Sequence, residues 1–572
     1  MKTVKNLKNV KPIKINAAKC AHDKKEVGSI NKMCLSPKLK NFRNTLVDFL
    51  KNTGMIGCAN YVAPGRHPVE RYIWALIHVI AIMSTIYVII DTTVDFADTS
   101  PVTSVESYNY PVQDVEFPGI SVCAINKISY AAAWDFATEL EQIPSTRAMN
   151  LTRNDIMKML PVLGRLYQFD IEPQEEKISR KLHHLLQAAY KIYDVNLIMS
   201  KLAPKCRNIM THCFWSGKEQ FYEDIIFLRK TQDGYCCTFN YVRVTDYFGK
   251  TKNQHQFDSS AVHPQVIGSS FGLTILLNPE LDDYYYQTSF MKGFKILVSK
   301  PKDYPDRPSG SLTEIIISPR TEVWLNLEAT TLYAVKSIRN YKPQKRKCLF
   351  ENEEVSEFGG YYSYSDCFIY CRVKEMAELC ECIAFFYPIP ISLASTKICN
   401  LENLECLQKH RKKWWNVVPL RMSYNISKIF NETENGLNEN YLKCDCLPSC
   451  EDLTYHVKST QAPLHSSSIR MGRNINISIK DHMILHIFFN KPGLTRLRQD
   501  VLVYWYELMS NYGGICGFFL GVSLISVIEF LYFFSVRLFD SKWKNAKKQE
   551  IITNQQYFHW NEIHMSHSGN KW

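Results

Sequence analysis

A long apolar run near the C-terminus, residues 513–536, constrains the folding of this chain more than any other feature. It reads GGICGFFLGVSLISVIEFLYFFSV, which is long enough to cross the hydrocarbon core of a bilayer as one helix. Gly513, Gly517 and Gly521 recur every four residues, so a single helix would carry all three on one face. Glycine weakens a helix and a lipid anchor does not need it, whereas small residues let helices approach closely in lipid. The glycine face therefore predicts a contact between helices.

The same run contains polar groups that a plain anchor would avoid. Ser523 and Ser526 lie just beyond the glycine face, and Glu529 is the only charged residue of the run. A carboxylate at membrane depth is costly unless it faces a bundle interior or water. We expect the small-residue face to meet copies of itself around an aqueous axis. A helix–helix contact without a pore is the alternative.

A second apolar run, residues 72–90, reads YIWALIHVIAIMSTIYVII and lies between Arg71 and Asp91. It carries no Asp, Glu, Lys or Arg and is long enough to span a bilayer, although a buried helix of a soluble protein is the alternative. Two spans would bracket residues 91–512. Both ends of that segment would then lie on the same side of the membrane.

The charge distribution indicates which side this is. Residues 1–71 carry 15 Lys/Arg against 4 Asp/Glu, and residues 537–572 carry 6 against 3. An excess of basic residues beside spans marks the cytoplasmic side, so we expect both termini in the cytoplasm, next to anionic lipid headgroups. A basic arm also suits nucleic acid, but its place beside a span argues against that partner. We expect no cleavable signal peptide, because the first 70 residues are polar and basic.

Cysteines and glycosylation signals agree with this topology. Fifteen of the 19 cysteines lie between the two runs, where an oxidising compartment lets disulfides persist. Zinc binding is the alternative for pairs such as Cys444-x-Cys446, but extracellular thiols are usually oxidised, so we expect no metal. All four Asn-x-Ser/Thr signals fall in the same segment, at Asn150, Asn425, Asn431 and Asn476. Residues 91–512 are therefore expected to be extracellular.

Hydrophobic periodicity predicts the remaining elements. Residues 1–38 lack an apolar period and read as an unstructured arm. Residues 39–50 have one apolar helical face, and the glycine-rich turn that follows would either re-enter the inner mouth of a pore or leave the helix lying on the membrane. The expected fold class is a membrane α+β protein with two transmembrane helices and a large disulfide-rich domain, which has a sheet core and peripheral helices. In that domain we expect helices at 134–142, 181–198 and 366–377, and strands at 271–277, 294–298, 314–317, 453–457 and 483–489.

The segment after the first run resembles a known family. Phe117-Pro118-Gly119-Ile120-Ser121-Val122-Cys123 is similar to the signature that follows the first span of degenerin/epithelial sodium channel subunits. The upstream Glu106-Ser107 and Tyr110-Pro111-Val112 resemble the insect pickpocket branch of that family. The resemblance runs from the pre-span helix to Glu529. It implies a trimeric, amiloride-sensitive, sodium-selective channel of the plasma membrane, homomeric or heteromeric with related subunits, with sodium ions as the conducted species and no cofactor.

The resemblance also implies roles for single residues. Gly521-Val522-Ser523 resembles the G-x-S selectivity filter, where backbone carbonyls and hydroxyls replace part of a cation's hydration shell. Ser510 falls at the degenerin position outside the gate, although a serine preceding a helix N-terminus is the plain alternative. Ile56-Gly57 aligns with the His-Gly of the inner gating motif, so the glycine turn is kept and the histidine is lost. The implied pore and gate residues are Ser510, Gly513, Gly517, Ser526 and Glu529.

A disulfide framework is implied by the same resemblance, since spacing alone does not give the pairing. Five bridges fall in a thumb at about 348–450, which acts as a lever between the outer domain and the spans. Cys237 is left over, and which member of the adjacent pair Cys236 and Cys237 is bridged stays open, with Gly-x-Cys-x-Thr-Phe-Asn favouring Cys236. The implied pairs are Cys123–Cys236, Cys206–Cys213, Cys348–Cys450, Cys367–Cys446, Cys371–Cys444, Cys380–Cys406 and Cys382–Cys399.

We therefore predict a channel subunit with five parts: a cytoplasmic arm with gating turn (1–71), a first span (72–90), an extracellular domain (91–512), a pore-lining second span (513–536) and a cytoplasmic tail (537–572). An ATP-gated trimeric channel would share two spans but show a lysine-rich nucleotide site in place of these signatures. A non-conducting or auxiliary receptor subunit is the main alternative, against which the polar groups of the second run argue. No G-x-S-x-G or H-E-x-x-H motif in the segment supports an ectoenzyme.

Overall fold

The computed structural model describes residues 37–53, 57–61, 65–99, 101–243, 261–310, 312–419, 441–465, 468–471, 475–478 and 480–537. The chain divides into two compact units, Met1–Ala97 with Val503–Trp572, and Asp98–Leu502. The first unit holds the helices that carry both apolar runs. The second unit holds the sheets and all of the disulfides found among the described residues.

The first apolar run lies within one continuous helix, α2 (Pro68–Asp98). Its side chains are mostly exposed in the single chain, among them Tyr72, Leu76, Ile80 and Tyr87. A soluble core helix would bury such residues, so the alternative of a buried helix does not hold. By length and composition, α2 is a candidate membrane span.

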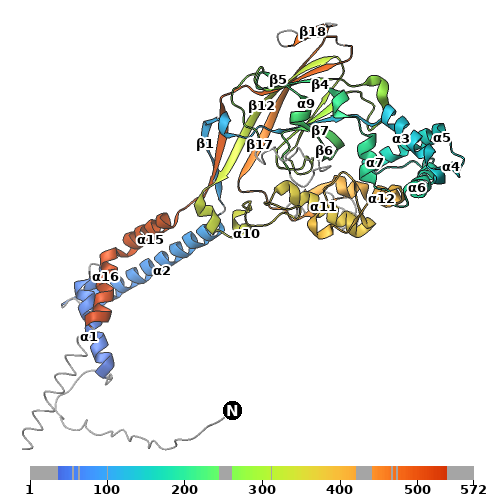
Figure 1. Cartoon of the computed structure of the whole chain (residues 1–572). Helices are drawn as coiled ribbons and strands as arrows, with labels where there is room; N and C mark the ends of the chain where they lie inside the picture. The colour runs from blue at the N-terminus through green and yellow to red at the C-terminus, as the bar shows by residue number, and fades with distance from the viewer. Residues whose placement is uncertain are drawn as a thin grey trace, which may run out of the picture. The chain divides into compact units, whose positions relative to one another are not determined.

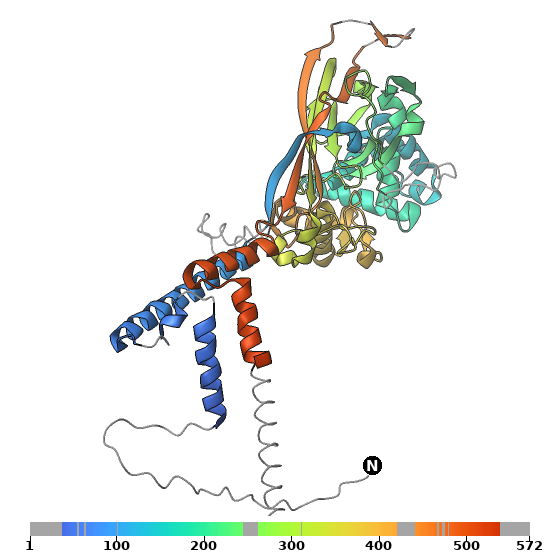
Figure 2. The ribbon, with the colours of Figure 1, turned by 90° about the vertical axis from the view of Figure 1, so that its left-hand side faces the viewer.

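The second apolar run is not one helix. It is divided between α15 (Trp505–Leu520) and α16 (Leu524–Tyr532), which continues as a short π-helix η10 (Phe533–Arg537). The two helices together pass as one candidate span, bent by 75° at the break (Figures 1 and 2). The expectation of a single helix over 513–536 is therefore wrong, because Gly521 leaves the helical region of backbone conformation.

The predicted pre-span helix is present as α1 (Pro37–Asn52), and it is followed by a single 3₁₀ turn, η1 (Cys58–Tyr61). Phe49 near the end of α1 is 5% exposed and packs edge-to-face on Phe530, Phe533 and Phe534. In both ribbon views α1 lies beside α16 (Figures 1 and 2). This contact joins the pre-span helix to the second candidate span.

The second unit is built on two sheets. Within its described residues, an eight-stranded sheet has the order β1-β21-β12-β20-β8-β4-β5, with β17 also paired to β12. The long strands β12 and β17 are antiparallel neighbours, whereas β20 and β21 run parallel to β12. The bounds are β1 (Val102–Pro111), β4 (Met210–Trp215), β5 (Lys218–Gln220), β8 (Leu273–Leu277), β12 (Thr321–Ala334), β17 (Asp452–Pro463), β20 (Met483–Phe489) and β21 (Gly493–Asp500).

The other large sheet has five strands among the described residues, in the order β11-β10-β2-β7-β6. Its apolar face packs on that of the eight-stranded sheet, and Phe117 fills the space between them, against Trp215, Phe239 and Phe489. The signature after the first span thus places a large ring at the centre of the core, just before β2. The bounds are β2 (Gly119–Ala124), β6 (Ile226–Thr231), β7 (Gly234–Phe239), β10 (Phe294–Ser299) and β11 (Thr313–Ile317).

Helices between residues 130 and 202 and between residues 364 and 415 pack beside the sheets and share a second core (Figure 1). The pattern at 181–198, predicted as one helix, forms two, because Lys191 has a φ of +59° at the end of α6. The helices are α3 (Tyr130–Gln142), α4 (Pro144–Arg147), α5 (Arg153–Met159), α6 (Glu176–Tyr190), α7 (Val195–Leu202), α8 (Cys206–Ile209), α9 (Tyr222–Ile225), α10 (Pro343–Arg346), α11 (Tyr364–Cys380) and α12 (Leu404–Trp415). The short strand pairs are β3 (Asn126–Ser129) with β9 (Tyr284–Gln287), β13 (Cys382–Ile383) with β14 (Lys397–Ile398), β15 (Val417–Pro419) with β16 (Leu442–Cys444), and β18 (Ser468–Met471) with β19 (Ile475–Ser478).

Six of the expected disulfide pairs are formed. Cys367 and Cys371, one turn apart on α11, bond to Cys446 and Cys444, so the helix is attached twice to the segment of β16. Cys380, the last residue of α11, bonds to Cys406 in α12. The other three are Cys123–Cys236, Cys348–Cys450 and Cys382–Cys399.

The expected Cys206–Cys213 pair is wrong: Cys206 bonds to Cys237, and Cys213 is a buried free thiol. Adjacent strand residues point to opposite faces of a sheet. Cys236 therefore meets Cys123 on one face of the five-stranded sheet, while Cys237 joins the core between the sheets, where Cys206 packs. Both members of the adjacent pair are bridged.

Candidate functional site

The break in the second span has a defined backbone geometry. Gly521 ends α15 with a φ of +64°, and its N–H donates to the carbonyl of Gly517 at 3.0 Å. This is a left-handed helix cap, which glycine adopts without the steric penalty that a Cβ brings. Gly521 therefore does not continue the face of Gly513 and Gly517. Gly521 was predicted to contact another helix, whereas in the structure it ends α15.

Two serines begin the next helix. Ser523 is the N-cap of α16, and its hydroxyl accepts from the N–H of Ser526 at 3.3 Å. The hydroxyl of Ser526 accepts in return from the N–H of Ser523, also at 3.3 Å. Such reciprocal capping satisfies donors that a helix start would leave unpaired in the membrane. The predicted filter and Ser526 thus form one capped break.

Gly513 and Gly517 lie on α15, where they leave its surface open. Within the described part of the chain, a Cβ added at Gly513 would meet no atom within 4 Å, and one at Gly517 would meet only the carbonyl oxygen of Val522, at 4.0 Å. The surface around both glycines is therefore available for another helix to approach closely.

Ser510 is exposed on the second turn of α15. The helix begins eight residues before the predicted span, at Trp505, and Glu507 accepts from the N–H of Tyr504 at its start. Ser510 therefore does not precede a helix N-terminus, which removes the plain alternative for this residue. Two residues on, the hydroxyl of Tyr512 lies 2.7 Å from that of Thr93 in α2, so a hydrogen bond joins the two candidate spans.

Glu529 lies in the middle of α16 and is half-buried in the single chain. The aromatic cluster of Phe49 with Phe530, Phe533 and Phe534 begins at the next residue. Of the predicted gating turn, Ile56 lies outside the described residues. Gly57 has a φ of +81°, as a tight turn requires.

Two of the contacts in this unit that join separate helices, Thr93–Tyr512 and the Phe49 cluster, were not predicted from the sequence. The apolar face of residues 39–50 indicated that Phe49 packs somewhere. No pattern in the sequence gave its partner, since residues far apart in the chain meet there.

In the second unit, α11 is held by buried charge as well as by disulfides. Arg372 and Asp306 are both fully buried and lie 2.7 Å apart, and Arg372 also donates to the hydroxyl of Tyr387 at 3.0 Å. A second buried pair joins Arg243 to Asp366, near the start of α11. These two ion pairs, together with the disulfides, attach α11 of the predicted thumb to neighbouring segments of the second unit.

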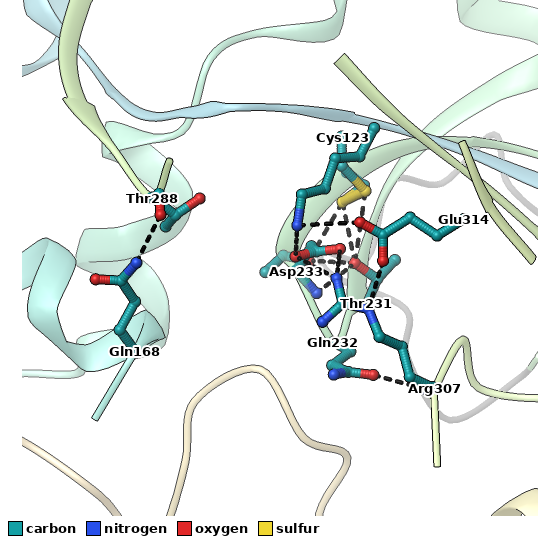
Figure 3. A network of polar contacts seen from close by, with 11 residues as sticks. Cys123, Gln168, Thr231, Gln232, Asp233, Thr288, Arg307 and Glu314 are labelled. Atoms are coloured by element: carbon teal, nitrogen blue, oxygen red, sulfur yellow. Dashed lines mark hydrogen bonds and ion pairs between the residues drawn. A yellow bond between two sulfur atoms is a disulfide. The ribbon is translucent and has the colours of Figure 1, made fainter. Parts of the chain in front are cut away.

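A charge cluster lies beside the Cys123–Cys236 bridge (Figure 3). Lys295 contacts Asp233 and Glu314 at 3.2 Å each, and Arg307 contacts the same two carboxylates. Lys127 is buried nearby, and within the described residues its ammonium has no hydrogen-bond partner. Burial, together with Lys295 and Arg307, lowers the pKa of Lys127 to about 8 against the pull of both carboxylates.

The described residues contain no cluster of three or more His, Cys, Asp or Glu that could hold a metal ion. Asn150 is exposed in a turn after α4, and Asn476 lies in β19. Asn425 and Asn431 lie outside the described residues. All four glycosylation sites stay predictions.

A continuous candidate span and a broken one flank a disulfide-rich α+β domain in the chain, which is the organisation of a two-span membrane protein. A model of the amiloride-sensitive sodium channel family matches residues 49–533. This chain therefore belongs to the amiloride-sensitive sodium channel family.

Relatives match over most of their length. The chain is 24% identical to the sodium channel protein Nach of Drosophila ananassae, over 93% of this chain and 95% of that protein. It is 22% identical to pickpocket protein 28 of Drosophila melanogaster, over 91% and 82%. It is 19% identical to the gamma subunit of the rat epithelial sodium channel, over 89% and 85%. A proton-activated chloride channel structure aligns with a TM-score of 0.24 at 6% identity, over 81% of this chain and 96% of that one.

Proposed function

We propose that this chain is a pore-forming subunit of a trimeric, sodium-selective cation channel of the plasma membrane. The observation that best supports this proposal is the break at Gly521-Val522-Ser523 inside an apolar span. Non-helical backbone at membrane depth is tolerated only where it is buried in protein or lines a water-filled cavity. The break would place backbone carbonyls and the Ser523 hydroxyl on that cavity, where they can replace water around a sodium ion.

A trimer, of this chain or with related subunits, follows from the family and suits the open surface at Gly513 and Gly517. Three copies around one axis would cover that surface and bring three breaks together as a filter. Glu529 would lie below the filter at the cytoplasmic mouth, where its charge favours cations. Both termini would lie in the cytoplasm, and amiloride would block the pore.

Gating would pass from the extracellular domain through the rigid α11 region to the outer end of α15. Ser510 is exposed there, so a bulky substitution at this position would keep neighbouring copies of α15 apart. A small serine permits closure of such a gate.

The test is a voltage-clamp recording from cells that express this chain alone, as wild type and as Ser510→Phe. We expect Ser510→Phe to give a sodium current that amiloride reduces, while the wild type is quiet. Surface biotinylation controls for delivery of both proteins. Silence of both at the surface would contradict a homomeric pore. Co-expression with related subunits would then separate an obligate partner subunit from a non-conducting receptor.

A further inference from the structure

The turn that precedes the first span packs closely on one residue of that span. A Cβ built at Gly57 would lie 2.7 Å from Cε1 and 3.3 Å from Nε2 of His78 in α2. Real Cβ atoms do not approach other atoms to 2.7 Å, so the imidazole occupies space that only a glycine leaves open.

The turn η1 adds contacts to the same histidine. The ring of Tyr61 meets the imidazole edge-to-face, with 5.2 Å between ring centroids, and the Tyr61 hydroxyl donates to the carbonyl of Trp74 at 3.2 Å. Nδ1 of His78 lies 3.0 Å from that carbonyl, one helical turn earlier in α2. Because a carbonyl can only accept, Nδ1 carries the proton in this contact. The imidazole is thus oriented by α2 and covered by the turn.

The same segment is attached to the second span at its other end, where Phe49 packs on Phe530, Phe533 and Phe534. Phe49 therefore contacts the helix that follows the break, while Gly57 and Tyr61, a few residues later in the chain, contact α2. The sequence at this turn, Ile56-Gly57, brings no polar side chain of its own. The polar group that meets the turn comes from the span.

We propose that His78 is a positioning residue that seats the turn at Gly57 against the first span and so fixes the connection between the two spans. The effect on current rests on the proposed channel function, whereas the contact between the Gly57 turn and His78 does not. Displacing the turn would shift Phe49, which packs on Phe530 in α16. This shift would change the fraction of time that the pore is open.

The seating is tested without any current. In a Cys58→Ser background, we expect Tyr61→Cys/His78→Cys to form a disulfide in oxidised membranes. It is detected in denatured, unreduced samples as two fewer maleimide-polyethylene glycol additions than in an unbridged pair, since the native disulfides block the same cysteines in both. The matched pair Tyr61→Cys/Ile77→Cys should not form it, because Ile77 is exposed on another side of α2. Equal bridging of both pairs, or of neither, would overturn the proposal.

The effect on gating is tested by a double-mutant cycle in the Ser510→Phe chain. Asn at position 57 tolerates the left-handed backbone but meets the imidazole. We expect His78→Ala and Gly57→Asn each to lower the current per surface channel about five-fold, and the double variant to lose no more than either alone. His78→Asn, which keeps a donor for the Trp74 carbonyl, should recover most of the current. A double variant that loses about 25-fold, the product of independent effects, would overturn the coupling. If the Ser510→Phe chain gives no current, this counts against the channel function. The disulfide experiment tests the contact between the turn and His78 independently of current.

Discussion

Lys127 combines complete burial with a surplus of positive charge. Three cations, Lys127, Lys295 and Arg307, face two carboxylates, Asp233 and Glu314. Charge balance is reached when one cation loses its proton, and Lys127 is the one whose ammonium lacks a hydrogen-bond acceptor among the described residues. Burial is the largest cause of its lowered pKa, and Lys295 and Arg307 add to it. This lowered pKa makes the stability of the extracellular domain depend on pH.

We predict that Lys127→Met raises the melting temperature of the solubilised full-length protein at pH 7. In the wild type the folded pKa is about 8, below the unfolded value of 10.5, so the unfolded chain binds more protons between these values and stability rises with pH there. Below pH 8 the buried charge costs about 3 kcal/mol in full. Differential scanning fluorimetry from pH 7 to 10 should show the two proteins converging as pH rises. The control is Lys177→Met, at an exposed lysine, which should follow the wild type. A constant gap across this range would contradict the account.

The cysteines Cys206, Cys213 and Cys237 give a second prediction at this scale. Burial raises the pKa of the Cys213 thiol to about 12, so this thiol is both inaccessible and protonated. Peptide mapping of the unreduced protein should find Cys206 joined to Cys237, and Cys213 should react with maleimide only after denaturation. Cys213→Ser should leave the map unchanged. Recovery of a Cys206–Cys213 peptide from the wild type would show that the bridge is assigned to the wrong partner.

At the scale of elements, α11 is attached by its disulfides and by the buried Arg372–Asp306 pair. Removing one member of such a pair leaves an uncompensated charge in the core, which costs about 3–5 kcal/mol. Arg372→Met should therefore lower the melting temperature strongly and reduce surface delivery. Asp306→Leu in the same chain should recover most of both, because no buried charge then remains. If the double variant is no better than Arg372→Met alone, packing rather than charge accounts for the loss.

The elements differ in how far sequence predicted them. Periodicity and β-branched composition located α1, α11 and the strands β8, β10, β11 and β20 to within a few residues, because each buries one face against a core. They missed the central strand β12, and α2 continues eight residues beyond the predicted span 72–90. The second span was predicted as one helix, since apolar length says nothing about a left-handed glycine that ends α15. Family resemblance predicted a filter at Gly521-Val522-Ser523, and the structure shows a helix break at these residues. The capping by Ser523 and Ser526 and the Thr93–Tyr512 bond emerged only in three dimensions. The adjacent Cys236 and Cys237 needed the strand's alternation to be assigned.

At the scale of the whole molecule, both proposals concern how separate spans act together. The break at Gly521 matters for conduction only if several copies bring it to one axis, and the segment from Phe49 to Tyr61 connects the spans of one chain. An assembly that conducts through this break should lose selectivity when the backbone of the break changes, even if delivery and the amount of current are preserved.

The reversal potential of the Ser510→Phe current, with sodium outside and potassium inside, tests the central claim most directly. The account predicts a positive value that shifts toward zero in Ser510→Phe/Gly521→Ala, because a Cβ strains the φ of +64° on which the break depends. The control Ser510→Phe/Gly514→Ala should keep the parent value, since a Cβ at Gly514 meets no atom within 4 Å in the described part of the chain. A reversal potential near zero in the parent, or an unchanged one after Gly521→Ala, would contradict a sodium-selective filter at this break.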